Sequence, residues 1–175
     1  FFFSCSGDHR DLHSFPTRRS ADLSVAVHLG LPHGGLRPAD RATDGLIQVL
    51  LDATRNHGLP LTAERLNSWH AALFPTGRAG LAAIRVGAWR ERPLEVVSGP
   101  LGRQRVHFAG PPPEALDAEM RNFLSWWEQS RTGMDGVLRA GMAHLRFVTI
   151  HPFDDGNGRL ARTLTDMALA QDENL

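Results

Sequence analysis

The chain has 175 residues, of which 42% are hydrophobic and 22% charged, a composition typical of a globular protein with a single core. Its 19 basic and 19 acidic side chains balance, so the basic excess of nucleic-acid-binding domains is absent and no nucleic acid is expected as a partner. No apolar run is long enough to cross a membrane, and the single cysteine, Cys5, excludes an intramolecular disulfide, which favours a reducing compartment and hence the cytoplasm. All 19 residues of the Lys+Arg set are arginines, a bias that suggests a GC-rich bacterial gene.

The first 23 residues have neither helical nor strand periodicity. Residues 12–23 read LHSFPTRRSADL, which differs only at Ala21 from the translation of a high-throughput sequencing adapter. We interpret residues 1–23 as a non-native, disordered segment, with a natural disordered leader as the alternative. Residues 24–175 then form the natural domain, which we expect to be truncated at its C-terminus because the chain closes inside a predicted helix.

Apolar residues at helical spacing predict two helices in the first half of this domain. The first covers residues 38–56, and the second runs from Thr62, a favourable N-cap, to about Phe74. Three strand-like stretches follow, at Ile84–Val86, Glu95–Val97 and Arg105–Phe108. The last two flank a turn-rich stretch, so they predict a small β-hairpin rather than a large sheet.

The second half is predicted to be helical. The expected helices cover residues 113–129, residues 136–148 behind Asp135 as N-cap, and residues 159–170. In the middle one, Leu138, Met142, Leu145 and Val148 recur at helical spacing. The fold class is therefore mainly α with one hairpin.

The loop between the last two predicted helices contains HPFDDGNGRLAR, residues 151–162. His151 is of a type that titrates near neutrality, so it can accept a proton at physiological pH. Asp154 and Asp155 offer hard oxygen ligands of the kind that Mg²⁺ prefers. These groups predict a base and a metal ligand in one short loop.

The same loop also has the parts of an anion site. Gly156 and Gly158 allow backbone conformations that other residues avoid and let the chain approach a ligand closely. The helix that follows directs its free N–H groups and positive dipole end towards the loop. Arg159 and Arg162 lie three residues apart on one side of that helix, and each offers a fork of donors to phosphate oxygens. Together the parts predict phosphate chemistry.

The twelve residues resemble the Fic signature, HxFx[D/E]GNGRxxR, with every fixed position present. The resemblance covers roughly residues 24–175 and implies the Fic fold, a helical bundle with a small β-hairpin flap. It implies a protein adenylyltransferase that moves AMP from ATP to a Ser, Thr or Tyr hydroxyl of a target protein, with Mg²⁺. The flap around Glu95–Phe108 would dock an extended segment of that target by strand addition.

The resemblance also assigns roles to single residues. His151 would be the general base that deprotonates the target hydroxyl. Asp155 would hold the magnesium that bridges the α- and β-phosphates. Phe153 would anchor the loop in the core, and Asp154, at the variable position, would be solvated.

The remaining motif residues would hold the nucleotide. Asn157, with the amides of Gly156 and Gly158, would cradle the phosphates. Arg159 would clamp the β-phosphate, and Arg162 would orient the γ-phosphate.

Outside the motif we expect structural roles. His144 and His70 are interpreted as core or helix-face histidines. Arg85, Arg90 and Arg92 are interpreted as a solvated face.

Two alternatives to AMP transfer remain open. The same scaffold could transfer another nucleotide, transfer a phosphoryl group or remove AMP; Gly158 disfavours phosphoryl transfer, because the branch of the family that catalyses it departs from the pattern at this glycine. The chain could also be a regulatory module that binds a nucleotide without reacting.

Overall fold

The computed structural model describes residues 25–31, 41–98 and 105–173. Residues 1–23, which we expect to be non-native, lie outside the described residues, as do residues 38–40 of the first predicted helix. Residues 25–29 are helical, and the helices that follow are α2 (Arg41–Arg55), α3 (Ala63–Leu73), the 3₁₀ turn η1 (Pro113–Ala115), α4 (Leu116–Gln129), α5 (Gly136–Ile150) and α6 (Asn157–Glu173). The strands are β1 (Arg78–Ala79), β2 (Ala82–Ala83), β3 (Glu95–Ser98) and β4 (Arg105–Ala109). The mainly α class with a small hairpin is thus confirmed.

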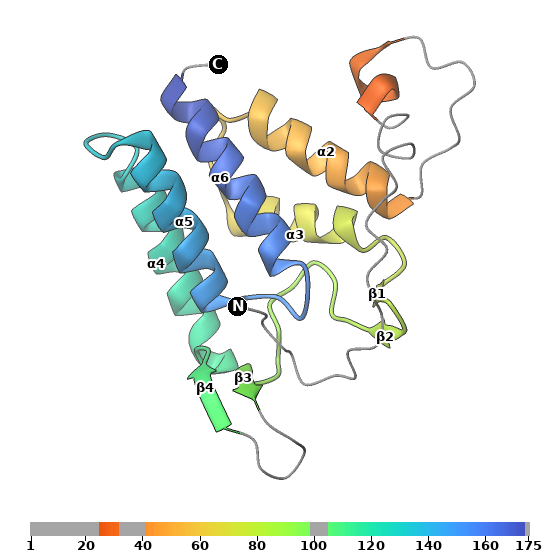
Figure 1. The fold of residues 1–175 in the computed structure, drawn as a ribbon, viewed down its shortest axis with the longest axis vertical. Coiled ribbons are helices and arrows are strands. Elements are labelled where there is room, and N and C mark those ends of the chain that lie inside the picture. The colour runs from red at the N-terminus through yellow and green to blue at the C-terminus, as the bar shows by residue number, and fades with distance from the viewer. Residues whose placement is uncertain (1–24, 32–40, 99–104, 174–175) are drawn as a thin grey trace.

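Helix α6 lies at the centre of the bundle, with α5 on one side and α2 on the other (Figure 1). One broad face of it is apolar, and its fully buried hydrophobic residues are Leu160, Ala161, Leu164, Met167 and Ala168. A helix with this pattern must pack that face against other elements to remove those side chains from water. The N-terminus of α6, which carries the motif, is therefore fixed by the packing of the whole bundle.

Both predicted N-caps are confirmed. The Thr62 hydroxyl accepts a hydrogen bond from the Arg65 N–H at 3.2 Å, and Asp135 Oδ1 accepts one from the Leu138 N–H at 3.0 Å. Such caps satisfy N–H groups that have no partner within the helix. The last helix is longer than predicted, because it begins at Asn157 and ends at Glu173.

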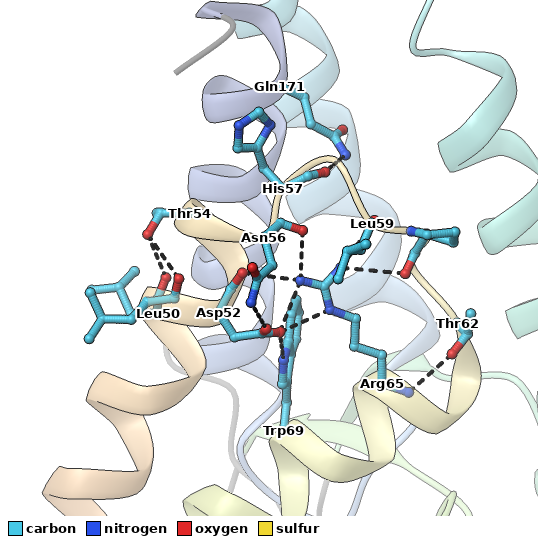
Figure 2. A network of polar contacts seen from close by, with 12 residues as sticks. Leu50, Asp52, Thr54, Asn56, His57, Leu59, Thr62, Arg65, Trp69 and Gln171 are labelled. Carbon is cyan, nitrogen blue, oxygen red and sulfur yellow. Dashed lines mark hydrogen bonds and ion pairs between the residues drawn. The ribbon is translucent and has the colours of Figure 1, made fainter. Parts of the chain in front are cut away.

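A polar network fastens α3 to the C-terminal end of α2 (Figure 2). Arg65 Nε and Trp69 Nε1 both donate to Asp52 Oδ2, at 2.9 and 2.8 Å. The same guanidinium donates to the carbonyl oxygens of Asn56 and Leu59, each at 3.1 Å. Burial alone would raise the pKa of Asp52, but hydrogen bonds from its neighbours, Arg65 and Trp69 among them, hold it below its usual value. The network fixes α3, and with it His70, which contacts the motif loop described below.

Helix α5 buries a different face from the one that its large apolar residues indicate. Leu138 and Leu145 are 57% and 60% exposed, whereas Ala140, Ala143 and Phe147 are at most 2% exposed. The small alanines allow α5 to pack closely against α6, with which it shares its largest helix interface. The prediction of the helix was right, and its apolar residues did not identify the buried side.

The predicted hairpin is formed by β3 and β4, which pair antiparallel with Glu95 opposite Ala109. The register shifts between Val96 and Val97, a local irregularity of the β-bulge kind. The hairpin projects from the end of the bundle at which α5 stops (Figure 1).

The strand predicted at Ile84–Val86 is wrong. The Arg85 N–H donates to Asp154 Oδ2 at 2.9 Å, and the Gly87 N–H donates to His70 Nδ1 at 3.0 Å. Side chains of the motif loop and of α3 therefore accept the hydrogen bonds that a neighbouring strand would otherwise take. Just before this segment, β1 and β2 form a two-residue antiparallel pair instead.

Within the described ranges, none of the helices has both the length and the apolar character needed to span a membrane.

Candidate active site

Helix α5 ends at the predicted base. His151 has a left-handed backbone, with φ of 51° and ψ of 60°, and its N–H closes the last turn by donating to the Phe147 carbonyl at 2.9 Å. It is the only residue other than glycine with a positive φ in the part of the chain that the structure describes. Such a conformation is unfavourable for a residue with a side chain and persists only where surrounding contacts hold it. The end of the helix therefore places the histidine at the start of the motif loop.

The imidazole of His151 is held in one neutral form. Its Nδ1 lies 3.2 Å from the Val148 carbonyl oxygen, and because a carbonyl only accepts, Nδ1 carries the proton. Burial lowers the pKa of His151, the Val148 carbonyl and the Asp155 charge partly oppose this, and the charge of Arg90 adds to the lowering. At neutral pH the side chain is then uncharged, with its lone pair on Nε2, which is the form that a general base requires.

Phe153 and Asn157 close the loop. Phe153 is fully buried, as predicted, and its ring stacks on His70 with a centroid distance of 4.1 Å. The Phe153 N–H donates to Asn157 Oδ1 at 3.0 Å, and Asn157 Nδ2 donates to the Phe153 carbonyl at 2.8 Å. The Asn157 side chain thus shapes the loop, and its backbone N–H, in the first turn of α6, has no acceptor within the helix.

The two glycines of the motif differ. Gly156 has a φ of 79°, and a Cβ built on it would lie 2.8 Å from Phe74 Cε2, so a side chain there would be strained and crowded. Gly158 belongs to the first turn of α6, and its Cβ would meet only Arg162 Nη1, at an ordinary 3.7 Å. The fold requires glycine at position 156 but not at position 158.

Asp155 and Arg159 border a cavity of about 440 Å³. Two further arginines line it, Arg41 at the start of α2 and Arg78 in β1. The Arg159 guanidinium lies 4.5 Å above the Phe74 ring, while Arg162, one turn further along α6, is exposed. The structure therefore places Asp155 and Arg159 at one cavity with a positive lining, whereas Arg162 is exposed and is not among the residues that line it.

The donor set fits a magnesium ion that keeps most of its waters. Among the residues that the structure describes, no three His, Cys, Asp or Glu side chains gather closely enough to form a metal cage. Asp155 is half-buried at the cavity, and its Oδ1 accepts a hydrogen bond from the Gly156 N–H. A single carboxylate beside a phosphate site is the usual protein contribution to a magnesium ion that is otherwise bound by phosphates and water.

Asp154 is half-buried, and its Oδ2 accepts an exposed hydrogen bond from the Arg85 N–H at 2.9 Å. Asp154 therefore contacts the irregular segment Ile84–Val86, which we predicted to be a strand.

His70 supports the loop from below. It is fully buried in α3, which confirms its interpretation as a core histidine. Because Nδ1 accepts from Gly87, Nε2 carries the proton and donates to the Asp155 carbonyl at 3.2 Å. One ring therefore joins α3, the irregular segment and the motif loop, which composition and helical spacing do not reveal.

The protonation of His70 should make stability depend on pH. Burial, above all, lowers its pKa from 6.5 to about 4, whereas the Asp155 carbonyl partly opposes this. Between these pH values the unfolded chain binds a proton that the folded protein excludes, so the free energy of unfolding falls as the pH falls from 6.5 to 4. The contribution of this histidine is at most about 3 kcal/mol.

Urea unfolding at intervals across that range measures the effect. His70→Gln keeps one donor and one acceptor and should lose less stability on acidification than the unaltered protein. Parallel losses in the two proteins would show that His70 is not the group responsible.

Arg90 lies near the site and is buried, although we predicted it to belong to a solvated face. It is 3% exposed, whereas Arg85 and Arg92 are exposed as predicted. Its Nε donates to the His151 carbonyl at 2.8 Å. No local pattern distinguishes it from the other two arginines, because its burial depends on contacts with residues about 60 positions away.

His144 lies half-buried on α5, one heptad before His151, with its Nδ1 3.4 Å from the Thr165 hydroxyl of α6. This position agrees with the helix-face role expected for it.

Comparisons with known proteins agree with this geometry. Residues 60–169 match the Fic/DOC family. A uridine 5′-monophosphate transferase from Xanthomonas campestris pv. campestris is 31% identical over 130 residues, which are 64% of this chain and 21% of that protein. The protein adenylyltransferase Fic of Aedes aegypti is 38% identical over 81 residues, 44% of this chain and 16% of that protein. The chain thus spans only a small part of the curated relatives that it matches.

Solved structures show the same fold. A Fic-domain-containing signalling protein from Bacteroides thetaiotaomicron superposes with a TM-score of 0.61 at 25% identity, covering 86% of this chain and 56% of that one. IbpAFic2 covalently tethered to Cdc42 superposes with a TM-score of 0.57 at 17% identity, covering 90% of this chain and 50% of that one.

Proposed function

Because the chain belongs to the Fic/DOC family, we propose that it is a nucleotidyl transferase that moves AMP from ATP to a Ser, Thr or Tyr hydroxyl of a target protein. One observation carries the proposal: a histidine whose Nδ1 lies 3.2 Å from the Val148 carbonyl oxygen begins the loop that leads into the N-terminus of α6. The name of the Aedes aegypti relative supports AMP as the transferred group and protein as the acceptor.

His151 would act as the general base. Its Nε2 takes the proton of the target hydroxyl while the hydroxyl oxygen forms a bond to the α-phosphorus of ATP. The bond between the α-phosphorus and the bridging oxygen breaks, and pyrophosphate leaves with its electron pair. The lowered pKa of His151 favours this step at neutral pH, since the imidazole is not already protonated.

The start of α6 would hold the phosphates. The N–H groups of Asn157 and Gly158 have no acceptor within the helix, and the helix dipole favours negative charge there. The Gly156 N–H, which donates to Asp155 Oδ1, would be shared between that carboxylate and the nucleotide. Arg159 at the cavity would clamp the β-phosphate, and the exposed Arg162 would reach the γ-phosphate.

Asp155 would be the protein ligand of Mg²⁺. Held there, the ion would supply positive charge that offsets the negative charge of the nucleotide phosphates. The backbone of Asp155 is held in place for this role because its carbonyl accepts the hydrogen bond from His70.

The hairpin would dock the target. Strands β3 and β4 pair only with each other among the described residues, so each has an open edge to which an extended segment can add. The structure of IbpAFic2 with Cdc42 supports a protein as the partner that a domain of this fold engages.

Transfer of UMP is the second candidate. The observation that favours it is the Xanthomonas campestris relative, which is named a uridine 5′-monophosphate transferase and matches the chain over 130 residues. The phosphate contacts proposed above are common to both nucleotides. The difference between ATP and UTP must therefore be recognised at the nucleobase, adenine or uracil.

Labelled nucleotides test the proposal. The full chain is incubated with Mg²⁺, a cell lysate and ATP labelled either at the α- or at the γ-phosphate, and in parallel with α-labelled UTP. We expect α-label from ATP on the chain itself or on lysate proteins and no γ-label. Label from UTP alone would establish the second candidate, γ-label would indicate phosphoryl transfer, and binding without label would indicate a non-catalytic module.

A further inference from the structure

Arg90 is a buried cation whose guanidinium is surrounded by backbone carbonyls. Its Nε donates to His151 at 2.8 Å, Nη1 to Arg92 at 2.7 Å, and Nη2 to Pro111 at 2.7 Å and to Ile150 at 3.4 Å. Its own N–H donates to the Pro152 carbonyl at 2.7 Å. One side chain thus joins the end of α5, the start of the motif loop and the two chain segments that flank the hairpin.

We propose that Arg90 is a positioning residue, which holds His151 in its left-handed conformation and fixes its imidazole relative to the target-docking hairpin. This inference rests on the function proposed above, because it concerns the base of that reaction. Arg90 donates to the carbonyl of the base rather than to a reacting atom, so its effect on chemistry is indirect.

The contacts explain how the conformation of His151 is held. Ile150 is the last residue of α5, where carbonyls have no partner in the helix and the dipole end is negative. A guanidinium satisfies both requirements, because it is charged and its donors diverge towards several acceptors. The His151 carbonyl accepts from Arg90 Nε, and the Pro152 carbonyl accepts from the backbone N–H of Arg90. The His151 backbone therefore cannot leave the left-handed region without breaking these two hydrogen bonds.

The same guanidinium holds the base of the hairpin. The Gly110 N–H closes the hairpin by donating to the Leu94 carbonyl at 2.9 Å, and Pro111 follows directly. A Cβ built on Gly110 would lie 3.3 Å from Arg90 Nη2, so the guanidinium packs directly against that closure. A target segment added to the hairpin would therefore be held at a fixed place relative to His151.

The test replaces the fork and keeps the charge. Arg90→Lys retains a cation but cannot reach the diverging carbonyls together. The matched control is Arg139→Lys, which alters a second arginine that is also 3% exposed and donates to the Trp127 carbonyl, Ser130 Oγ and Gln171 Oε1. It lies twelve residues before His151 on the same helix, about 18 Å along its axis, so it reports the loss of a buried guanidinium without the contact to the base.

Two readouts are taken on the full chain, each normalised to the folded fraction. Nucleotide transfer in Arg90→Lys should fall in kcat by about 10- to 100-fold, with nucleotide affinity changed by less than about 2-fold, because a small displacement of the base slows the reaction without altering phosphate contacts. Nitrogen chemical shifts of ¹⁵N-labelled histidine should show His151 protonated at Nδ1 in the unaltered protein and a mixture of tautomers in Arg90→Lys. Arg139→Lys should leave both readouts unchanged.

The outcomes separate the two proposals. If the unaltered chain transfers nucleotide and Arg90→Lys changes neither kcat nor the His151 tautomer, Arg90 has no positioning role. If Arg139→Lys lowers kcat as much as Arg90→Lys does, the effect is one of general stability and the inference fails. If the unaltered chain transfers nothing, the proposed reaction fails, and the nitrogen shifts alone decide whether Arg90 holds His151. Should Arg90→Lys not fold, Arg90→Met, which keeps an unbranched apolar stem and has no donor for the His151 carbonyl, takes its place in the same measurements.

Discussion

Replacing His151 by alanine should lower the kcat of nucleotide transfer by about 10²- to 10⁴-fold, the usual contribution of a positioned general base. The reason is the form in which the ring is held: Nδ1 is committed to the Val148 carbonyl, and the lowered pKa leaves Nε2 unprotonated at neutral pH. Nucleotide affinity should be nearly unchanged, because the proposed phosphate contacts come from the start of α6 and from Arg159. Transfer of label from α-labelled ATP and equilibrium binding of a non-hydrolysable analogue measure the two quantities separately.

His144→Ala is the matched control. This second histidine of α5 lies one heptad earlier and contacts Thr165 rather than the motif loop. It should leave transfer within about 2-fold of the unaltered rate. Equal losses in the two variants would mean that the chemistry does not depend on a base at position 151, and undiminished transfer in His151→Ala would remove His151 from the mechanism.

The elements of the fold were largely predictable because their signals are local. Thr62 and Asp135 are caps that act within three residues, and the apolar period of α6 is visible in the sequence itself. The motif was equally accessible, since Phe153, Gly156 and Asn157 form their structure within one loop. Side-chain contacts at short sequence distance are what a sequence pattern can report.

The errors concern residues whose partners are distant. Arg90 is buried by carbonyls of the α5 end and of Pro111, and the amide of Arg85 is taken by Asp154, 69 residues later. The exposed Leu138 and the buried Ala140 of α5 follow the same rule. There the close approach of α6, rather than the size of the apolar side chains, decides which face is covered.

The two motif glycines should respond differently to substitution by alanine. Gly156→Ala should destabilise the protein by about 2–4 kcal/mol, because alanine must take a positive φ and its Cβ meets the Phe74 ring. Gly158→Ala should leave the free energy of unfolding unchanged or raise it by up to about 1 kcal/mol, since a helical glycine with room for a methyl group gains from the substitution. Urea unfolding of the two variants beside the unaltered protein measures both values.

Nucleotide binding should respond in the opposite way at position 158. A methyl group on Gly158 would project where the free N–H groups of the first α6 turn meet the proposed phosphates, so affinity should fall by about 10-fold or more despite the intact fold. Titration of ATP into the folded Gly158→Ala variant measures this loss. Unchanged affinity would place the phosphates elsewhere along the cavity, nearer Arg41 and Arg78, and unchanged stability in Gly156→Ala would mean that the loop can adopt another backbone without loss. If both expected losses are measured, glycine at position 156 is explained by folding and glycine at position 158 by the ligand, although the two lie close together in one motif.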